Sequence, residues 1–271
     1  MENNLDQFYT NKVIAKKCIT ELEREIGCIS TWKNILEPSA GSGCFLDLLP
    51  PHSIGLDLDP RSIKVIQTDY LLWSVPDAMK NCIVIGNPPF GKNSSLAVKF
   101  FNKSATFAKV IAFIVPRTFR KDSIINRLNK QFHLAHETVL PVNSFHTPAG
   151  DIKNVPTCFQ IWKLSQIIRS TSKKKLEEIQ DWDWVKDRCN ATHAIRRVGV
   201  NAGKLVQIEN ASQSSHFFIK SNINDISKRW EILYLSHWNE EKEYNPKWDV
   251  AGNPSLTKKE IICFYNGMYK L

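Results

Sequence analysis

The sequence lacks the features of metal-held, disulfide-held and membrane-embedded proteins. None of its seven cysteines forms a C-x-x-C pair and their number is odd, so we expect neither a zinc site nor a disulfide framework. The longest apolar run, around 110–115, has about seven residues, whereas a membrane helix needs roughly twenty. The first ten residues, MENNLDQFYT, are polar and acidic, unlike a secretory signal. We therefore expect a reducing compartment, the cytoplasm or a eukaryotic nucleus.

Acidic residues are also in short supply. The chain has 36 Lys and Arg against 27 Asp and Glu, which gives a formal net charge of +9. With 42% hydrophobic residues the composition is globular and excludes a disordered chain. The basic excess favours a polyanionic partner, nucleic acid first, but charge alone does not exclude a basic protein without one.

Short apolar runs alternate with helical or turn segments before residue 165. The spacing predicts helices at 13–26, 94–108 and 121–131, and strands near 34–36, 53–57, 65–69, 82–85 and 110–115. Such runs indicate an α/β fold with a doubly wound, mostly parallel sheet. Two later strands, near 134–141 and 155–164, should pair antiparallel at its edge. Charged and Trp-rich stretches follow, so we expect a domain at 1–165 and a small second region at 166–271.

The first strand runs into EPSAGSGCF, which lacks the third glycine of a dinucleotide fingerprint. Leu46 stands where G-x-G-x-x-G requires glycine, and the acidic Glu37 precedes the turn. A Gly-x-Gly turn still lets a nucleotide-like ligand approach the backbone closely. Polar groups follow the next three strands as well: Asp57, Asp69 and Asn87. Because strand C-termini line the crevice of an open α/β sheet, these groups should share one site.

Five segments together, DQFYT, EPSAGSGCF, GLDLDP, QTD and NPPF, resemble the motifs of the S-adenosylmethionine-dependent methyltransferases that act on adenine N6. Their order is similar to that of the gamma-type DNA adenine methyltransferases, a family associated with restriction–modification. The resemblance spans roughly residues 5–164. It implies a seven-stranded class I methyltransferase sheet, S-adenosylmethionine as cofactor, no metal, and DNA rather than RNA as partner.

The resemblance also implies individual roles. Asp57 would hold the cofactor's ribose and Asp69 would accept from its adenine, while the FYT segment would close over the methionine end. The positions implied for cofactor binding are Phe8, Tyr9, Thr10, Glu37, Pro38, Gly41, Gly43, Phe45, Asp57, Asp69 and Asn87. Two departures stand out. Asn11 follows FYT where the family often has proline, and the crossover after GLDLDP leaves room for about one helical turn.

The NPPF corner carries the expected chemistry through Asn87, Pro88, Pro89 and Phe90. An exocyclic amine is a poor nucleophile because its lone pair is delocalised into the ring. Accepting both N–H bonds, from the Asn87 side chain and the Pro88 carbonyl, would free that lone pair. The prolines fix the carbonyl in advance, and Phe90 offers a π surface to the target ring.

A duplex adenine must leave its stack to reach such a corner, and other side chains would then hold the target. The resemblance points to Phe145 opposite the flipped base, with an apolar packing role as the alternative. Basic residues could hold phosphates. The positions expected to contact the target are Phe90, Phe145, Arg117, Arg120, Arg196, Arg197 and Lys204.

Three alternative functions remain open from the sequence. An RNA adenine methyltransferase would use the same chemistry. A glutamine methyltransferase would share NPPF but would not account for DQFYT or a basic C-terminal tail. A catalytically silent nucleic-acid-binding subunit would usually lose the glycine loop or the NPPF corner, and both are intact here.

Overall fold

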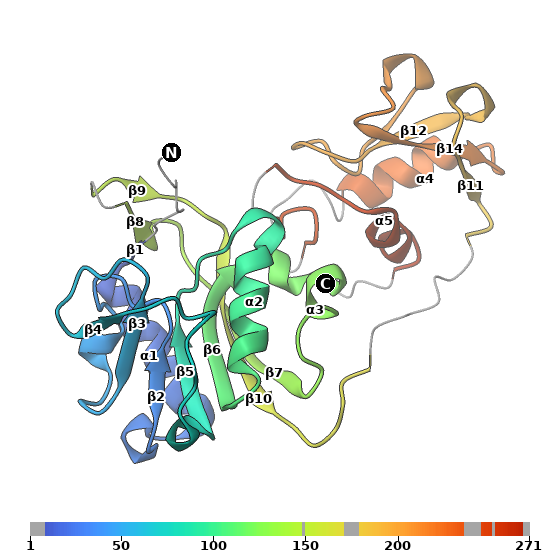
Figure 1. The fold of residues 1–271 in the computed structure, drawn as a ribbon. Coiled ribbons are helices and arrows are strands. Elements are labelled where there is room, and N and C mark those ends of the chain that lie inside the picture. The colour runs from blue at the N-terminus through green and yellow to red at the C-terminus, as the bar shows by residue number, and fades with distance from the viewer. Residues whose placement is uncertain (1–8, 148–149, 171–178, 236–244, 251–252, 268–271) are drawn as a thin grey trace. The chain divides into compact units, whose positions relative to one another are not determined.

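The computed structural model in Figure 1 describes residues 9–147, 150–170, 179–235, 245–250 and 253–267. Its contacts divide the chain into two compact units, 1–172 and 173–271, each described here by itself. The change of sequence texture near 165 follows directly on the last strand of the first unit, which ends at Leu164. Phe8 lies outside the described residues.

The first unit is built on a seven-stranded sheet. Its strands are β2 (Ile35–Glu37), β3 (Ile54–Asp57), β4 (Val65–Gln67), β5 (Cys82–Gly86), β6 (Ala108–Pro116), β7 (Phe132–Val139) and β10 (Thr157–Leu164). They lie in the order β4-β3-β2-β5-β6-β10-β7, and β10 runs antiparallel to both of its neighbours. A parallel sheet with one reversed strand beside its edge is the class I methyltransferase-like arrangement. The expected fold class and the expected antiparallel pair are confirmed.

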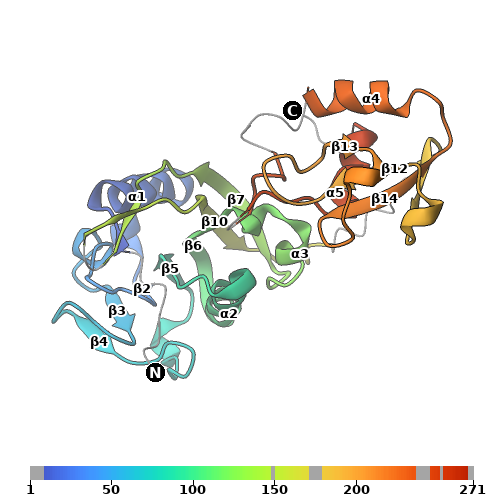
Figure 2. The ribbon, with the colours of Figure 1, turned by 90° about the horizontal axis from the view of Figure 1, so that it is seen from above.

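Helices cover both faces of this sheet because its strands are apolar on both sides. α1 (Lys12–Ile26) packs over a cluster that includes Ile35 and Ile83. α2 (Ser95–Ser104) packs over a cluster that includes the intervening residues Leu36 and Val84. In the view of Figure 2 these two helices lie on opposite sides of β5 and β6.

The helix expected at 121–131 is much shorter than the pattern suggests. α3 covers only Asp122–Ile125, after a 3-10 turn at Arg117–Arg120. Beyond Ile125 the backbone tightens into i→i−3 bonds, from Arg127 N to Ile124 O and from Leu128 N to Ile125 O. Asn129 Oδ1 then accepts from Gln131 N at 2.9 Å, which closes a local turn where the helix was expected to continue.

The first two crossovers contain almost no helix. Between β2 and β3 there is one 3-10 turn, Leu46–Leu48, and the short segment between β3 and β4 is formed by turns and bends. The single helical turn expected there is therefore absent. Apolar side chains consequently stay exposed around β4, with Ile63 fully exposed and Ile66 55% exposed.

A small three-stranded sheet joins residues 9–10 to the segment between β7 and β10. β1 (Tyr9–Thr10) pairs antiparallel with β8 (Phe145–His146), which pairs in turn with β9 (Ile152–Lys153). The Tyr9 and His146 rings lie 5.9 Å apart. Tyr9 and Thr10 of the FYT motif are thus held by residues far away in the sequence.

The second unit contains an antiparallel sheet in the order β11-β14-β12-β13. The strands are β11 (Trp182–Val185), β12 (His193–Arg196), β13 (Leu205–Val206) and β14 (His216–Ser221), with helices α4 (Ile226–Leu233) and α5 (Lys258–Tyr265). Its core is rich in aromatic rings. Trp182 packs against Trp230 and Tyr265 at ring distances of 5.8 Å in both pairs.

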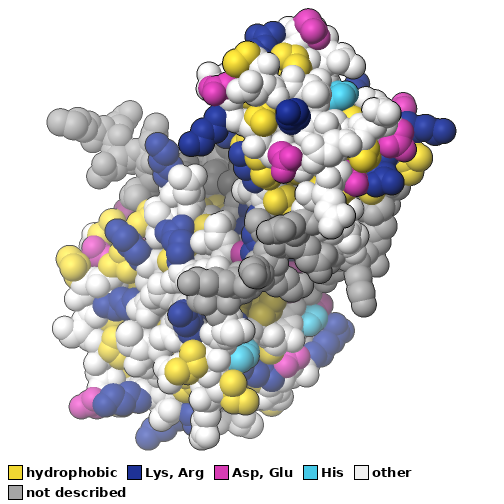
Figure 3. Space-filling view, turned by 90° about the vertical axis from the view of Figure 1, so that its right-hand side faces the viewer, with side chains coloured by type: hydrophobic (Ala, Val, Ile, Leu, Met, Phe, Trp, Pro, Cys, Tyr) yellow, Lys and Arg dark blue, Asp and Glu magenta, His cyan; other side chains and the backbone are white. Residues whose placement is uncertain are grey.

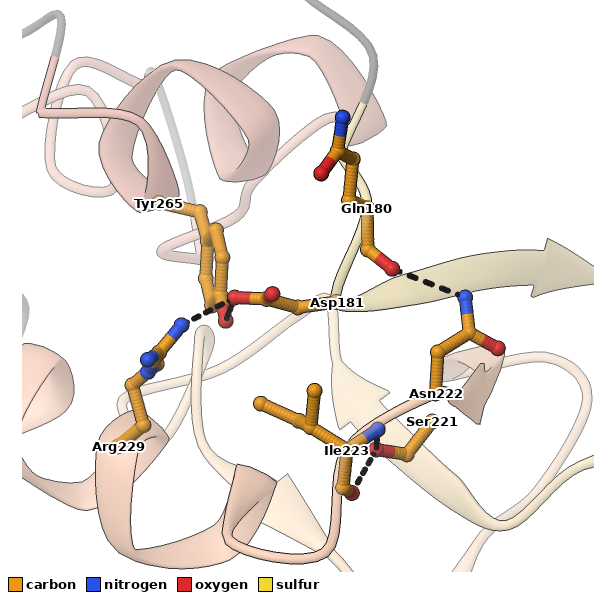
Figure 4. Close-up of polar contacts among 7 residues, drawn as sticks. All are labelled: Gln180, Asp181, Ser221, Asn222, Ile223, Arg229 and Tyr265. Atoms are coloured by element: carbon orange, nitrogen blue, oxygen red, sulfur yellow. Dashed lines mark hydrogen bonds and ion pairs between the residues drawn. The ribbon is translucent and has the colours of Figure 1, made fainter.

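Polar contacts around Asp181 join the beginning of β11 to both helices of this unit (Figure 4). The Asp181 carboxylate accepts from the Tyr265 hydroxyl at 2.6 Å and also from the Arg229 guanidinium. On the other side of Asp181, Asn222 Nδ2 donates to Gln180 O at 3.0 Å. These contacts fix the end of β14 beside the start of β11.

Positive charge is not concentrated in the C-terminal unit. Residues 173–271 contain 16 Lys and Arg against 13 Asp and Glu, and residues 1–172 contain 20 against 14. On the face shown in Figure 3, basic side chains are scattered among carboxylates instead of forming one continuous patch. The tail is therefore basic by a net charge of +3, a smaller excess than the +6 of residues 1–172.

The described residues hold neither a cluster of metal ligands nor a membrane-spanning helix. Among them, no group of three or more His, Cys, Asp or Glu side chains is placed to hold a metal ion. No helix that the structure describes has both the length and the apolar character needed to cross a membrane.

Candidate cofactor and active site

A cavity of about 260 Å³ opens where the parallel strands end. Its lining comes from the segments after β2, β3, β4 and β5 together with β1 and α2. The lining residues are Tyr9, Thr10, Glu37, Pro38, Ser39, Ala40, Gly41, Ser42, Cys44, Phe45, Asp57, Leu58, Asp59, Asp69, Tyr70, Leu71, Asn87, Pro88, Pro89, Phe90, Leu96 and Phe100. The polar groups expected to share one site therefore do so.

Asp57 anchors the glycine loop to the end of β3. Its Oδ2 accepts from Gly41 N at 2.7 Å, and its Oδ1 accepts from Asp59 N at 2.8 Å. Gly41 has φ +51°, and a Cβ there would lie 2.9 Å from the Tyr9 ring. Only glycine fits this position, because the backbone is left-handed and β1 lies directly against the loop. Asp57 thus shapes the loop as well as facing the cavity.

Glu37 is a buried carboxyl group at the end of β2. Its side chain is 2% exposed, and Oε2 has no hydrogen-bond partner in the structure. Burial, reinforced by the nearby carboxylates of Asp57 and Asp47, raises the pKa of Glu37 well above its ordinary value. An unsatisfied carboxyl oxygen that lines a cavity is suited to a cationic ligand group.

The NPPF corner is held by both neighbouring segments. Ser39 Oγ donates to Asn87 O at 3.1 Å, which ties the corner to the glycine loop. Phe90 O accepts from the backbone N–H of Leu96 and of Ala97 at 3.2 and 3.3 Å. The corner is therefore bound at both ends to rigid elements, as a preorganised acceptor site requires.

The residues after the corner adopt an unusual backbone. Gly91, Asn93 and Ser94 all have positive φ angles, a conformation that non-glycine residues seldom adopt. The Ser94 hydroxyl lies 2.7 Å from that of Thr118, and Arg127 donates to Asn93 O at 3.3 Å. These contacts hold the turn that leads from Phe90 into α2.

The segment after β4 closes the remaining side of the cavity. Asp69 Oδ1 accepts from Leu71 N at 2.8 Å, and the Tyr70 hydroxyl pairs with Ser104 at 2.7 Å. Lys103 Nζ donates to the carbonyls of Leu71 and Trp73 at 3.0 and 2.7 Å. An otherwise irregular segment is thereby fixed so that Asp69 faces the cavity.

Most residues expected at the cofactor site line this cavity. Gly43 does not: it has φ +84° and forms the loop turn through Gly43 N to Ala40 O at 2.6 Å. Phe90 lines the cavity with a side chain that is 8% exposed, so only a small part of its ring faces solvent.

Several residues expected to contact the target lie elsewhere. Phe145 is 2% exposed and packs in the core cluster under α1, which corresponds to the packing alternative. Arg117 is 5% exposed, and Arg120 forms a buried ion pair with Glu137 at 2.7 Å. The structure therefore offers neither guanidinium to a substrate.

The remaining three basic residues belong to the second unit. Arg196 and Lys204 are exposed, and Arg197 is half-buried, with its Nε donating to Ser214 O at 3.0 Å. They do not line the cavity of the first unit. Any contact they make with a target would therefore be separate from the cavity itself.

Part of the lining was not predicted from the sequence. Ser39 and Asp59 belong to the EPSAGSGCF and GLDLDP motifs. Their proximity to Glu37 and Asp57 in the sequence could have predicted that they line the cavity. Leu96 and Phe100 are spaced i, i+4 on an apolar helix face, a pattern that indicates core packing and gives no sign of a cavity.

Comparisons with known proteins give distant structural similarity. No protein-family model matches the sequence, and no curated protein matches it. Among solved structures, a Pyrococcus horikoshii protein provisionally assigned as an RNA methyltransferase has a TM-score of 0.46 and 18% identity, over 59% of this chain and 88% of that one. The 23S rRNA methyltransferase ErmE has a TM-score of 0.41 and 15% identity, over 59% and 70%.

A third match is a SAM-dependent methyltransferase from Anabaena variabilis. Its TM-score is 0.37 and its identity 13%, over 58% of this chain and 87% of that one. The chain is thus distantly similar in structure to S-adenosylmethionine-dependent methyltransferases. With TM-scores and identities this low, the substrates of these proteins carry no inference about this one.

Proposed function

We propose that this chain is an S-adenosylmethionine-dependent methyltransferase that acts on the exocyclic N6 of adenine, in DNA rather than RNA. One observation supports this above all. The residues that follow four parallel strands, Glu37, Asp57, Asp69 and Asn87, meet in one cavity with Tyr9 of β1. Five separate sequence motifs thereby form a single site.

The cavity residues fit the cofactor. The unsatisfied Glu37 Oε2 is suited to a cationic group, and the left-handed turn at Gly41, packed against Tyr9, shapes the loop that lines the cavity. Asp57 and Asp69 supply acceptors for ribose hydroxyls and an adenine amino group. When bound, S-adenosylmethionine would supply an electrophilic methyl group. The chain's own part is to orient that group and to exclude water around it.

Asn87 and Pro88 would act on the target amine. The Asn87 side chain and the Pro88 carbonyl can accept its two N–H bonds, which localises the nitrogen lone pair toward the methyl group. The backbone ties from Ser39 to Asn87 and from α2 to Phe90 hold these acceptors in place before the target arrives. A duplex adenine would have to flip out to reach them, at a cost of roughly a few kcal/mol.

Transfer from labelled S-adenosylmethionine to DNA and RNA of the same sequence, followed by nucleoside analysis, tests this function. We expect N6-methylated deoxyadenosine from the DNA. Product only from the RNA would overturn the DNA assignment and favour the RNA alternative. Cofactor binding without transfer to either would favour a silent subunit, and label in protein would favour glutamine methylation.

A further inference from the structure

Two aromatic rings at the edge of the second unit's core are partly open to solvent. Trp184 on β11 and Phe217 on β14 lie on one face of the sheet, and their ring centres are 5.6 Å apart. Trp182, two residues earlier on the same face, is 2% exposed and closes the core. The Trp184 and Phe217 pair, whose rings meet edge to face, therefore continues the core outward into a half-exposed aromatic surface, here called the platform.

Basic groups gather over these rings. Lys258 Nζ lies 4.6 Å from the centre of the Trp184 ring and 5.5 Å from that of Phe217. The Arg197 guanidinium lies 5.7 Å from the Phe217 ring centre. Such distances are within the range of cation–π attraction. Two cations from distant parts of the sequence thus meet on one aromatic pair.

The positive charge of this cluster is not compensated by ion pairs. Within the part of the chain that the structure describes, Lys186, Lys258 and Arg197 form none with a carboxylate. Partial burial, and then the charge of Lys186, lower the pKa of Lys258. A partly desolvated cation beside a second cation is stabilised by an anion that approaches from solvent.

We propose that Trp184, Phe217, Lys258 and Arg197 form a binding site for single-stranded nucleic acid. The cations would contact a phosphate, and an unpaired base would stack on the platform. The two rings meet at 75°, so a base would stack on the face of one ring at a time. A partly exposed aromatic ring next to positive charge is the combination with which proteins hold unpaired strands. The choice of nucleic acid rests on the proposed function, since the site would hold the same strand from which the target base is taken.

The proposed site includes Arg197 but not its neighbour Arg196. Arg197 reaches the Phe217 ring, whereas Arg196 belongs to β12 directly opposite His216 and its Nε donates to Val198 O at 3.3 Å. A purely structural explanation also exists, in which the basic side chains shield the rings with their aliphatic stems. The two explanations predict different affinities for nucleic acid when the charge is removed and most of the aliphatic stem is kept. Only the binding-site explanation predicts a loss of affinity.

The test uses the full-length chain and a labelled oligonucleotide, supplied as single-stranded DNA, as RNA of the same sequence and as duplex DNA. Binding is measured by fluorescence anisotropy at several salt concentrations. The Lys258→Gln, Arg197→Gln double variant should bind single strands about tenfold or more weakly, with a salt dependence reduced by about one phosphate contact per lost cation. An affinity equal to that of the unchanged protein would overturn the site.

Lys220→Gln is the matched charge control. Lys220 is exposed on β14 but belongs to the opposite face from Phe217. It should change single-strand affinity by less than about twofold, in line with ordinary exposed charges. An equal loss in Lys220→Gln would show unspecific attraction and overturn the proposal.

Phe217→Leu tests the stacking part. It keeps an apolar side chain but removes the aromatic surface, so it should weaken binding of single strands more than of duplex. Equal loss on both would overturn the role of an unpaired base. The DNA and RNA arms then show which strand the site prefers, because they differ in the sugar 2′-hydroxyl and in uracil for thymine.

Methyl transfer, measured in parallel, separates this inference from the proposed function. Transfer by the unchanged protein, together with unaltered binding by the double variant, would overturn the site alone. A binding defect in the double variant without transfer by the unchanged protein would support the site and overturn the function.

Discussion

The two units use their sheets differently. In the first unit the parallel strands β2, β3, β4 and β5 all end at one edge, and the residue groups after them share a single cavity. In the second unit every pairing is antiparallel, so neighbouring strands end at opposite edges. Its notable side chains, Trp184 and Phe217, lie instead on a sheet face beside basic residues.

This difference has a physical reason. Parallel strands concentrate polar strand ends and backbone N–H groups at one place, which favours a small-molecule site. An antiparallel sheet spreads its strand ends but presents a regular face, which suits contact with an extended strand. We therefore propose a division of roles, with methyl transfer in the first unit and nucleic-acid binding in the second. The following experiments test this division.

The largest effect should come from Asn87→Ala. We expect turnover to fall by about 10²–10³-fold, because an acceptor aimed at the reacting amine acts in the transition state. Cofactor binding, read as a rise in melting temperature on addition of S-adenosylmethionine, should remain. Near-normal turnover would refute the role of the NPPF corner. A lost thermal shift would show that Asn87 acts mainly in cofactor binding and not on the target amine.

Asp57→Asn should come next. Its carboxylate holds Gly41 N and Asp59 N at once, and an amide offers only one oxygen for both. We expect cofactor affinity to fall by at least about tenfold, the order expected when a charged hydrogen bond is lost. Isothermal titration with S-adenosylmethionine measures it.

Asp47→Asn is the control for that change. Asp47 belongs to the same crossover, pairs with Lys64 at 2.7 Å and does not line the cavity. It should leave affinity unchanged. Similar losses in both variants would mean that overall negative charge, and not the Asp57 contacts, determines cofactor binding.

The part of the fold that the sequence predicts best depends on local pattern. Buried parallel strands are apolar on both sides, and their ends are marked by Glu37, Asp57, Asp69 and Asn87, so sheet and site follow from spacing. The shortness of α3 does not, because apolar periodicity reveals neither the i→i−3 bonds beyond Ile125 nor the turn that the Asn129 side chain closes.

Side-chain burial does not follow from the local pattern of the sequence. Arg120 and Phe145 have the types expected of target contacts, but the buried Glu137 pairs with the first and the core encloses the second. The cation–π cluster of Trp184, Phe217, Lys258 and Arg197 joins residues from four separate segments. Only the folded chain brings such residues together.

Glu37→Gln should give a smaller, pH-dependent effect in the first unit. The pKa of Glu37 is raised in the folded state, so the unfolded state loses its proton first as pH rises. Stability is therefore full below the ordinary glutamate pKa of 4.5 and falls between that value and the raised one. Thermal denaturation of the chain without cofactor should show this decline in the unchanged protein.

The variant should not show that decline, since glutamine does not titrate. Saturating S-adenosylmethionine should shrink the difference between the two proteins, because a cationic group beside Glu37 favours its ionised form. Parallel pH profiles with and without cofactor would refute the idea that Glu37 faces a cation.

The smallest effect concerns the second unit. Asp181→Asn keeps one acceptor for the Tyr265 hydroxyl but removes the charge that also holds Arg229. Burial, and then the hydrogen bond to Asp181, raise the pKa of Tyr265 to about 12, so the variant should lower that pKa toward its ordinary value of 10.0. Hydrogen exchange followed by mass spectrometry should show faster exchange in β11, α4 and α5, because their shared contact is weakened. Peptides that contain Glu37, Gly41 or Asn87 should keep their protection, and the cofactor-induced rise in melting temperature should be unchanged.

Asp183→Asn, an exposed neighbour on β11 whose carboxylate accepts from Asn222 at 3.1 Å, is the control and should leave α4 and α5 unaffected. Faster exchange around Asn87 in the Asp181 variant would show that the units are coupled. It would refute the division of methyl transfer and nucleic-acid binding between them.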